Sequence, residues 1–146
     1  MARHEVLRPQ AWDWPGLRVL LERPSAEETP ARIDALRRAG YAVAVCPGPT
    51  AEERCPLAGD EGCAAAHGAD VIVSSLRLES VEAREALAAL RTRLPRLPVL
   101  IEADAAAASR WPELVRHGDR LEPGIAPSEL VERVEAAISK EPVVSD

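Results

Sequence analysis

The sequence contains no phenylalanine, and only 3% of its residues are aromatic. A core must therefore be built from Leu, Val, Ile and Ala, whose side chains suit close packing of helices on a sheet. No run of about 18 or more apolar residues occurs, and the N-terminus lacks the basic-then-apolar pattern of a secretory signal. We expect a cytoplasmic protein that does not partner with a membrane.

Positive charge is also in short supply. The chain has 18 Lys and Arg residues against 24 Asp and Glu residues, which gives a formal net charge of −6. The basic residues do not cluster into one dominant face, so a general affinity for phosphate backbones is not expected. We therefore expect no nucleic-acid partner.

The length of 146 residues fits one domain and leaves no room for a second. We assign residues 1–16, with Trp12 and Trp14, to an N-terminal leader that lies across the domain surface. The domain itself is expected over residues 17–139, and residues 140–146 are expected to form a flexible tail.

Apolar runs and helical patterns alternate along this domain. Strands are predicted at residues 17–22, 41–46, 71–76, 98–103 and 119–122. Helices are predicted at 30–39, 63–67, 80–94 and 111–118, and from Pro127 to 138, and residues 105–110 are open to inclusion in the fourth helix. Short connections between alternating elements imply right-handed crossovers and a parallel sheet with helices on both faces. The fold class is therefore α/β, a single doubly wound five-stranded parallel sheet.

Four local motifs occur along the chain, and their joint order is more informative about the type of protein than any single motif. They are RAGY at 38–41, GADVIV at 68–73, LPRLPVL at 94–100 and IAPSEL at 125–130. In this order they resemble the receiver domains of bacterial two-component response regulators. The resemblance implies a flavodoxin-like strand order of 2-1-3-4-5 and a place in signal transduction.

The same resemblance implies a lost chemistry. Receiver phosphorylation needs two carboxylates that hold Mg²⁺, an Asp nucleophile, a Ser or Thr and a Lys, because the metal and the Lys neutralise charge on the phosphoryl oxygens. The matching positions are Glu22 and Arg23 for the acid pair, Ser75 for the nucleophile (Ser74 after a shift of one residue), the vicinity of Ala103 for the hydroxyl and the vicinity of Pro123 for the Lys. All four depart from the family pattern, so the resemblance implies a degenerate, phosphorylation-independent receiver.

The carboxylates beside the hydroxyl position, Glu102 and Asp104, are interpreted as solvated groups or as a cap of the following helix. Ser75 is not expected to act as a nucleophile, because neither a nearby His nor a nucleophile-elbow glycine pattern accompanies it. We therefore expect no enzymatic activity. By resemblance, residues 111–138 are expected to contact a protein partner or a second copy of the chain.

Three cysteines and one histidine lie within a single segment: Cys46, Cys55, Cys63 and His67. Cys63 and His67 are four residues apart, so a helix would place both on one face. Three interpretations stay open. The thiols are small apolar residues and the chain needs no cofactor. Alternatively the segment holds zinc or an iron–sulfur cluster, or Cys55 and Cys63 form a redox pair. The last two would make the protein a cysteine-based sensor on the same scaffold.

Overall fold

The computed structural model describes residues 16–22, 26–50, 55–59 and 62–139. The predicted leader up to residue 15, with Trp12 and Trp14, and the predicted tail lie outside these ranges, and so does Arg23. In the described part, no helix is both long and apolar enough to cross a membrane.

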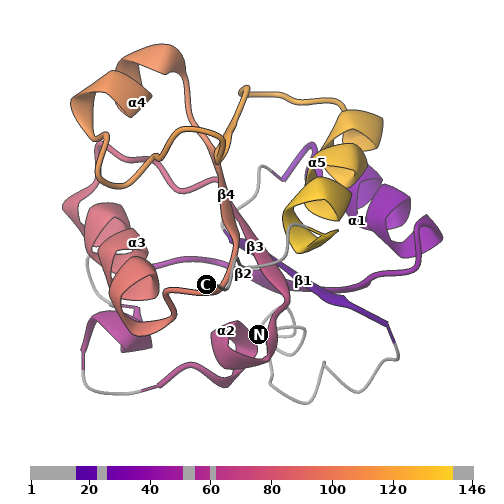
Figure 1. The fold of residues 1–146 in the computed structure, drawn as a ribbon, viewed down its shortest axis with the longest axis horizontal. Coiled ribbons are helices and arrows are strands. Elements are labelled where there is room, and N and C mark those ends of the chain that lie inside the picture. The colour runs from indigo at the N-terminus through magenta and orange to yellow at the C-terminus, as the bar shows by residue number, and fades with distance from the viewer. Residues whose placement is uncertain (1–15, 23–25, 51–54, 60–61, 140–146) are drawn as a thin grey trace.

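Five parallel strands form the central sheet in the order β2-β1-β3-β4-β5, as the resemblance predicted (Figure 1). They are β1 (Arg18–Glu22), β2 (Ala42–Cys46), β3 (Val71–Ser74), β4 (Val99–Glu102) and β5 (Arg120–Leu121). Strands β1 and β3 are almost entirely buried, since helices cover both faces of the sheet. The β2 and β5 strands form the two edges.

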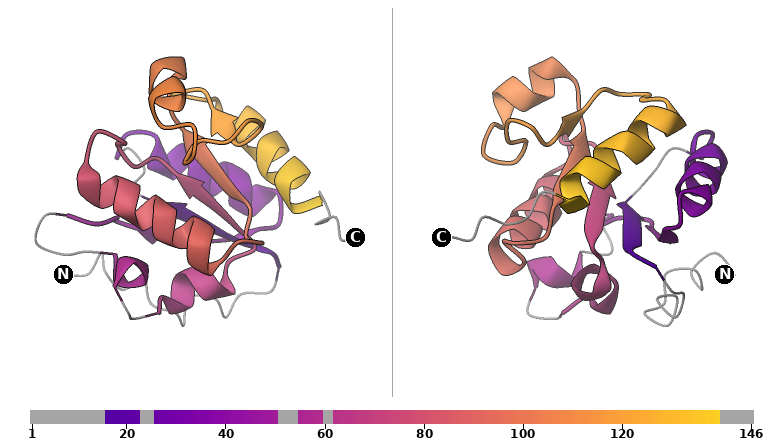
Figure 2. Two further views of the ribbon diagram at one scale, coloured as in Figure 1. Left: turned by 60° about the vertical axis from the view of Figure 1, so that its left-hand side comes forward. Right: turned by 45° about the vertical axis from the view of Figure 1, so that its right-hand side comes forward.

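The helices are divided between the two faces (Figure 2). Helices α1 (Thr29–Arg38) and α5 (Pro127–Ser139) pack on one face, where Leu36, Leu130 and Val134 are buried. The short 3-10 helix η3 (Pro56–Ala58), α2 (Ala64–Gly68) and α3 (Val81–Arg93) pack on the other face, and α4 (Ala105–Arg110) lies beside α3 with partly buried alanines. The domain is thus a three-layer sandwich.

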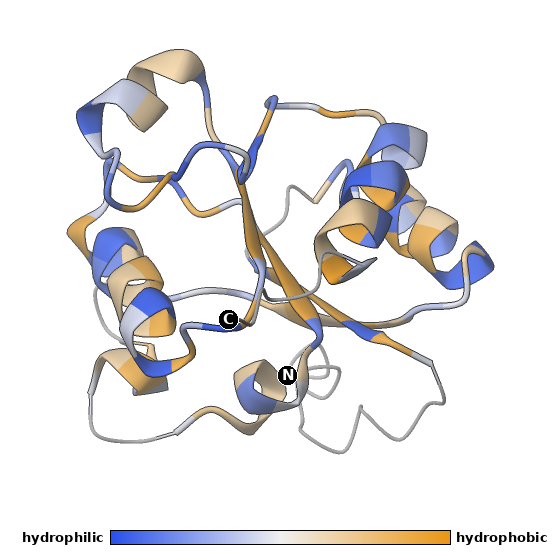
Figure 3. Ribbon diagram, in the orientation of Figure 1, coloured by the Kyte–Doolittle hydropathy of each residue, from blue (hydrophilic) through white to orange (hydrophobic). Residues whose placement is uncertain are grey.

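Alternation along the strands divides the core in two. In β1, Leu20 belongs to the cluster under η3, α2 and α3, while Val19 and Leu21 belong to the cluster under α1 and α5. Figure 3 shows the resulting pattern, with hydrophobic strands in the centre and helices that carry hydrophilic residues outward.

The fourth helix was predicted in the wrong place. The sequence Trp111–Gly118 was expected to be helical, because Pro112 and Gly118 fit a first turn and an end, but it forms a succession of turns. The helix instead covers Ala105–Arg110, because the Asp104 carboxylate accepts a hydrogen bond from the Ala107 amide at 2.8 Å and caps it.

Candidate functional site

Three of the positions predicted for a receiver's phosphorylation pocket meet at the carboxyl edge of the sheet. Ser75, Ala103 and Pro123 line one cavity of about 370 Å³, together with Glu102 and Asp104. The end of β3, the end of β4 and the connection after β5 bring them together. We call this the degenerate pocket.

A largely buried ion pair borders the degenerate pocket through Glu102, which lines it. Arg32 of α1 reaches Glu102 with both terminal nitrogens, at 3.1 Å and 2.9 Å. The Ser75 hydroxyl donates to Glu102 Oε1 at 2.6 Å, and the Gly124 amide donates to Oε2 at 2.7 Å. The Ser75 hydroxyl, at the position predicted for the nucleophile, therefore donates to a carboxylate that accepts hydrogen bonds from Arg32 and Gly124 as well.

This network shifts the pKa values of both Glu102 and Arg32 in the direction that favours their charged forms. Burial alone would raise the pKa of Glu102, but the hydrogen bonds from Arg32, Ser75 and Gly124 and the charge of Arg32 outweigh it, so this pKa lies below its ordinary value. The pKa of Arg32 is raised, chiefly by its hydrogen bond to Glu102. Arg32 is only 1% exposed and also pairs with Glu28 at 3.1 Å, so loss of Arg32 would leave Glu102 without its cation.

Arg32 was missed by the sequence reasoning, and Glu102 was interpreted wrongly as a solvated group or a cap. One signal for Arg32 was present, because it lies four residues before the buried Leu36 and therefore on the inward stripe of α1. An arginine on such a stripe needs a buried partner.

Glu22 and Ser74, the other predicted members of the pocket, do not line it. They lie opposite each other in the register between β1 and β3, and Cys46 of β2 lies opposite Glu22 on the other side. The three side chains form one row across the strand ends, on the face that η3, α2 and α3 cover. Ser74 is completely buried and hydrogen-bonds to Glu22, so it is not presented to the degenerate pocket.

Glu22 instead borders a second cavity, which contains all three cysteines. Cys46, Cys55 and Cys63 line this space of about 220 Å³, and we call it the cysteine cavity. Its remaining walls are mainly Leu20, Leu57, Ala66, Leu90 and the prolines 47, 49 and 56. The predicted fourth member, His67, is exposed and does not line the cavity, although it lies one helical turn from Cys63 as expected.

The donor groups around the cysteine cavity bear on the predicted metal site. Within the described ranges, no group of three or more His, Cys, Asp or Glu side chains is placed to hold an ion. The three thiols are free and half-buried. Burial raises the pKa of Cys46 to about 12, helped by the nearby Glu22 carboxyl, so this thiol is protonated at neutral pH.

Glu22 is the most unusual group in the cysteine cavity. Its side chain is 5% exposed, and its buried Oε1 has no hydrogen-bond partner among the described residues. Burial raises its pKa from 4.5 to about 7, although the hydrogen bond with Ser74 opposes the shift. An unpaired buried polar atom of this kind costs about 1–3 kcal/mol.

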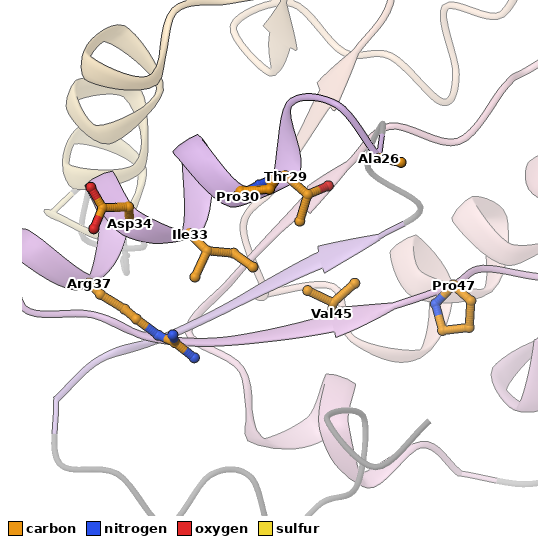
Figure 4. Close-up of a pocket in the computed structure, with 8 residues that line it drawn as sticks. All are labelled: Ala26, Thr29, Pro30, Ile33, Asp34, Arg37, Val45 and Pro47. Atoms are coloured by element: carbon orange, nitrogen blue, oxygen red, sulfur yellow. The ribbon is translucent and has the colours of Figure 1, made fainter. Parts of the chain in front are cut away.

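Another depression lies along β2, at the edge of the sheet. It is an open groove between α1 and β2, with Ile33 and Val45 in its apolar part and Asp34 and Arg37 at one end (Figure 4). Asp34 already pairs with Arg38 at 3.1 Å. The residues that line this groove include no cysteine or histidine, and we assign it no chemistry.

Comparison with known proteins identifies the fold. The sequence matches no protein-family model and no curated protein sequence. The structure is similar to the apo receiver domain of Nitrogen Regulatory Protein C, with 26% identity, a TM-score of 0.60, and coverage of 85% of this chain and 94% of that domain. It is also similar to the non-phosphorylated HemR receiver domain from Leptospira biflexa, at 20% identity and a TM-score of 0.64, over 88% of this chain and 99% of that one.

A further neighbour is a response regulator receiver domain protein from Methanospirillum hungatei. It shares 14% identity and a TM-score of 0.63, and the match covers 86% of this chain and 95% of that one. The predicted resemblance to receiver domains and the predicted doubly wound fold are therefore confirmed.

Proposed function

We propose that this chain is a receiver-like signalling module that acts by protein contact and without Asp phosphorylation. One observation carries the proposal: the hydroxyl of Ser75, at the position of the receiver nucleophile, donates to Glu102, which is paired with the buried Arg32. A hydroxyl held in this way faces an ionised acceptor and is not presented to an incoming phosphoryl group. The resemblance to receiver domains supports a signalling role, and we infer no enzymatic activity.

The test is incubation with acetyl phosphate and Mg²⁺, followed by intact mass measurement. We expect no phosphoryl adduct, whereas a receiver domain with a complete acid pair, Asp and Lys, run in parallel, should gain one. A stable gain of one phosphoryl group would contradict the proposal. The Asp104→Asn variant would then show whether the carboxylate of the degenerate pocket had accepted it.

The contact surface is proposed within residues 111–138, from the resemblance to receivers that pair through this region. Trp111 begins it, with the guanidinium groups of Arg84 and Arg110 at 5.1 Å and 4.8 Å from its ring. On α5, Leu130 and Val134 face the core, so the opposite side of the helix is available to a partner. The kind of partner is a protein, or a second copy of the chain.

Self-association is measured by analytical ultracentrifugation over a range of concentrations. Glu132→Arg reverses an exposed charge on α5, and Glu79→Arg makes the same reversal at an exposed position outside the proposed surface. If the chain pairs through this surface, only the α5 variant should weaken association. Equal effects of both variants would contradict the assignment.

The alternative is a cysteine-based redox or metal sensor. Its supporting observation is that Cys46, Cys55 and Cys63 border one cavity, although His67 does not join them. Elemental analysis and a thiol count on anaerobically purified protein test it. Metal-free protein whose three thiols stay reduced in air would end this alternative.

A further inference from the structure

We propose that the cysteine cavity binds a small, neutral, mainly apolar organic molecule whose single hydroxyl group hydrogen-bonds to Oε1 of Glu22. This site is separate from the degenerate pocket and from the proposed contact surface. Its test therefore succeeds or fails independently of the proposed function.

The first support is the orientation of Glu22. The residue ends β1, an inner strand of the sheet, borders the cavity and is 95% buried, and Ser74 satisfies only part of its carboxyl group. Oε1 is buried without a partner among the described residues. Buried polar atoms are nearly always hydrogen-bonded, so this oxygen indicates a missing partner inside the cavity.

The second support is the chemistry of the walls. Apart from Glu22, the described residues of the lining are Leu, Ala, Pro, Gly and Cys, and none of these described residues is a Lys, Arg or His. An anion would therefore find no compensating charge among them. A metal ion is disfavoured because no trio of donors is placed to hold it in the described part of the chain.

The ionisation states of Glu22 and the cysteines also favour a neutral ligand. The pKa of Glu22 is about 7 because of burial, and the pKa values of Cys46 and Cys55 are raised for the same reason. Below about pH 7 Glu22, Cys46 and Cys55 are therefore mainly uncharged. A cation that enters the cavity would lose its hydration shell and gain only one carboxylate partner, and this exchange rarely lowers the free energy. A hydroxyl group fits better, because it both donates and accepts.

The third support is that the outer wall is held in place. Arg93 of α3 donates to the Leu57 carbonyl at 3.0 Å and to the Gly59 carbonyl at 3.1 Å, which fixes η3 against α3. The Leu57 side chain, 2% exposed, is packed into the core beside the cavity. The cavity also lies at the carboxyl edge of the strands, where open α/β sheets bind ligands.

The experiment compares four probes of similar size by two-dimensional NMR titration at pH 6. They are phenol, toluene, benzoate and benzylammonium. We expect phenol to bind with a dissociation constant on the order of 1 mM and to shift the signals of Leu20, Cys46 and Leu57. Toluene should bind about tenfold more weakly, since it lacks the hydrogen bond. Benzoate should not bind.

Two substitutions assign the hydrogen bond to Glu22. Glu22→Gln keeps a polar oxygen at this place and should bind phenol within about threefold of the parent chain. Glu22→Leu removes it and should bind phenol only as weakly as toluene. Glu132→Gln, on the exposed face of α5, is the control and should change nothing. The spectrum of each free variant shows whether it has folded, and Glu22→Met takes the place of Glu22→Leu if the Leu variant does not fold.

Three results would overturn the proposal. Absence of binding by every probe would mean that water alone satisfies Oε1. Equal binding of phenol and toluene would remove Glu22 from the site. Tighter binding of benzylammonium than of phenol, or Zn²⁺ uptake that requires the three cysteines, would replace the neutral molecule with a cation.

Discussion

Replacement of Glu22 by Gln should change how the stability of the protein depends on pH. The folded-state pKa of this carboxyl is about 7, because burial raises it from 4.5. Below pH 4.5 the carboxyl is protonated in both the folded and the unfolded chain, so its ionisation does not affect the free energy of unfolding. Between these two values the unfolded chain has released its proton while the folded chain keeps it, so the free energy of unfolding falls as pH rises.

The magnitude follows from the width of this interval. Each pH unit is worth about 1.4 kcal/mol, so the full loss is about 3 kcal/mol, and most of it falls between pH 5 and pH 8. Above about pH 8 the loss is complete. The Gln side chain has no proton to release, so the Glu22→Gln variant should gain about 2–3 kcal/mol relative to the parent chain over this range.

Urea unfolding followed by circular dichroism, from pH 5 to pH 8, measures the difference. Subtracting the two chains removes the titration of all other groups. Glu132→Gln removes one carboxyl from the exposed face of α5 and serves as the control. Parallel stability curves for the parent chain and the Glu22→Gln variant would refute the reasoning, since the carboxyl would then be hydrated in the folded state.

Three further outcomes are expected. Arg32→Met should lower the free energy of unfolding, measured in the same urea assay, by about 3–5 kcal/mol, because it leaves Glu102 buried without its cation. Adding Glu102→Leu to this variant should restore part of the lost stability. The Cys46 thiol should react with iodoacetamide at pH 8 at least about 100-fold more slowly in the folded chain than in urea, because burial keeps it protonated. Peptide mass mapping measures the two rates, and equal rates would contradict the burial of this thiol. Ser80→Ala should cost about 1 kcal/mol in urea unfolding, since the Ser80 hydroxyl caps α3 by accepting from the Ala83 amide at 3.2 Å, and an unchanged midpoint would contradict that role.

The regular elements were predictable from the sequence because they depend on local patterns. The apolar run that ends at Glu22 and the stripe of α5 from Leu130 to Ile138 each carry the period of their element, and both lie where they were expected. The fourth helix was misplaced because two signals competed. Pro112 favoured a start there, but Asp104 caps a helix eight residues earlier, and that helix contains the six residues Ala105–Arg110.

The sites were harder to predict, because they depend on which strands are neighbours and in what register. Glu22 was grouped with Ser75 by its place in the motif pattern, whereas the pairing of β1 with β2 places it beside Cys46. The Arg32–Glu102 pair joins residues 70 positions apart, and no local pattern links an arginine of α1 to the end of β4. The common cavity of the three cysteines likewise depends on how η3 and α2 fold back over the sheet.

The Arg32–Glu102 pair also determines what an aspartate at position 75 would encounter. Ser75→Asp, by itself, would set a second carboxylate against Glu102, and the single guanidinium of Arg32 already serves the first. Like charges at such short range oppose each other's ionisation. An ionised aspartate at position 75 would therefore require the removal of Glu102 as well, which takes from the buried Arg32 one of its two carboxylate partners.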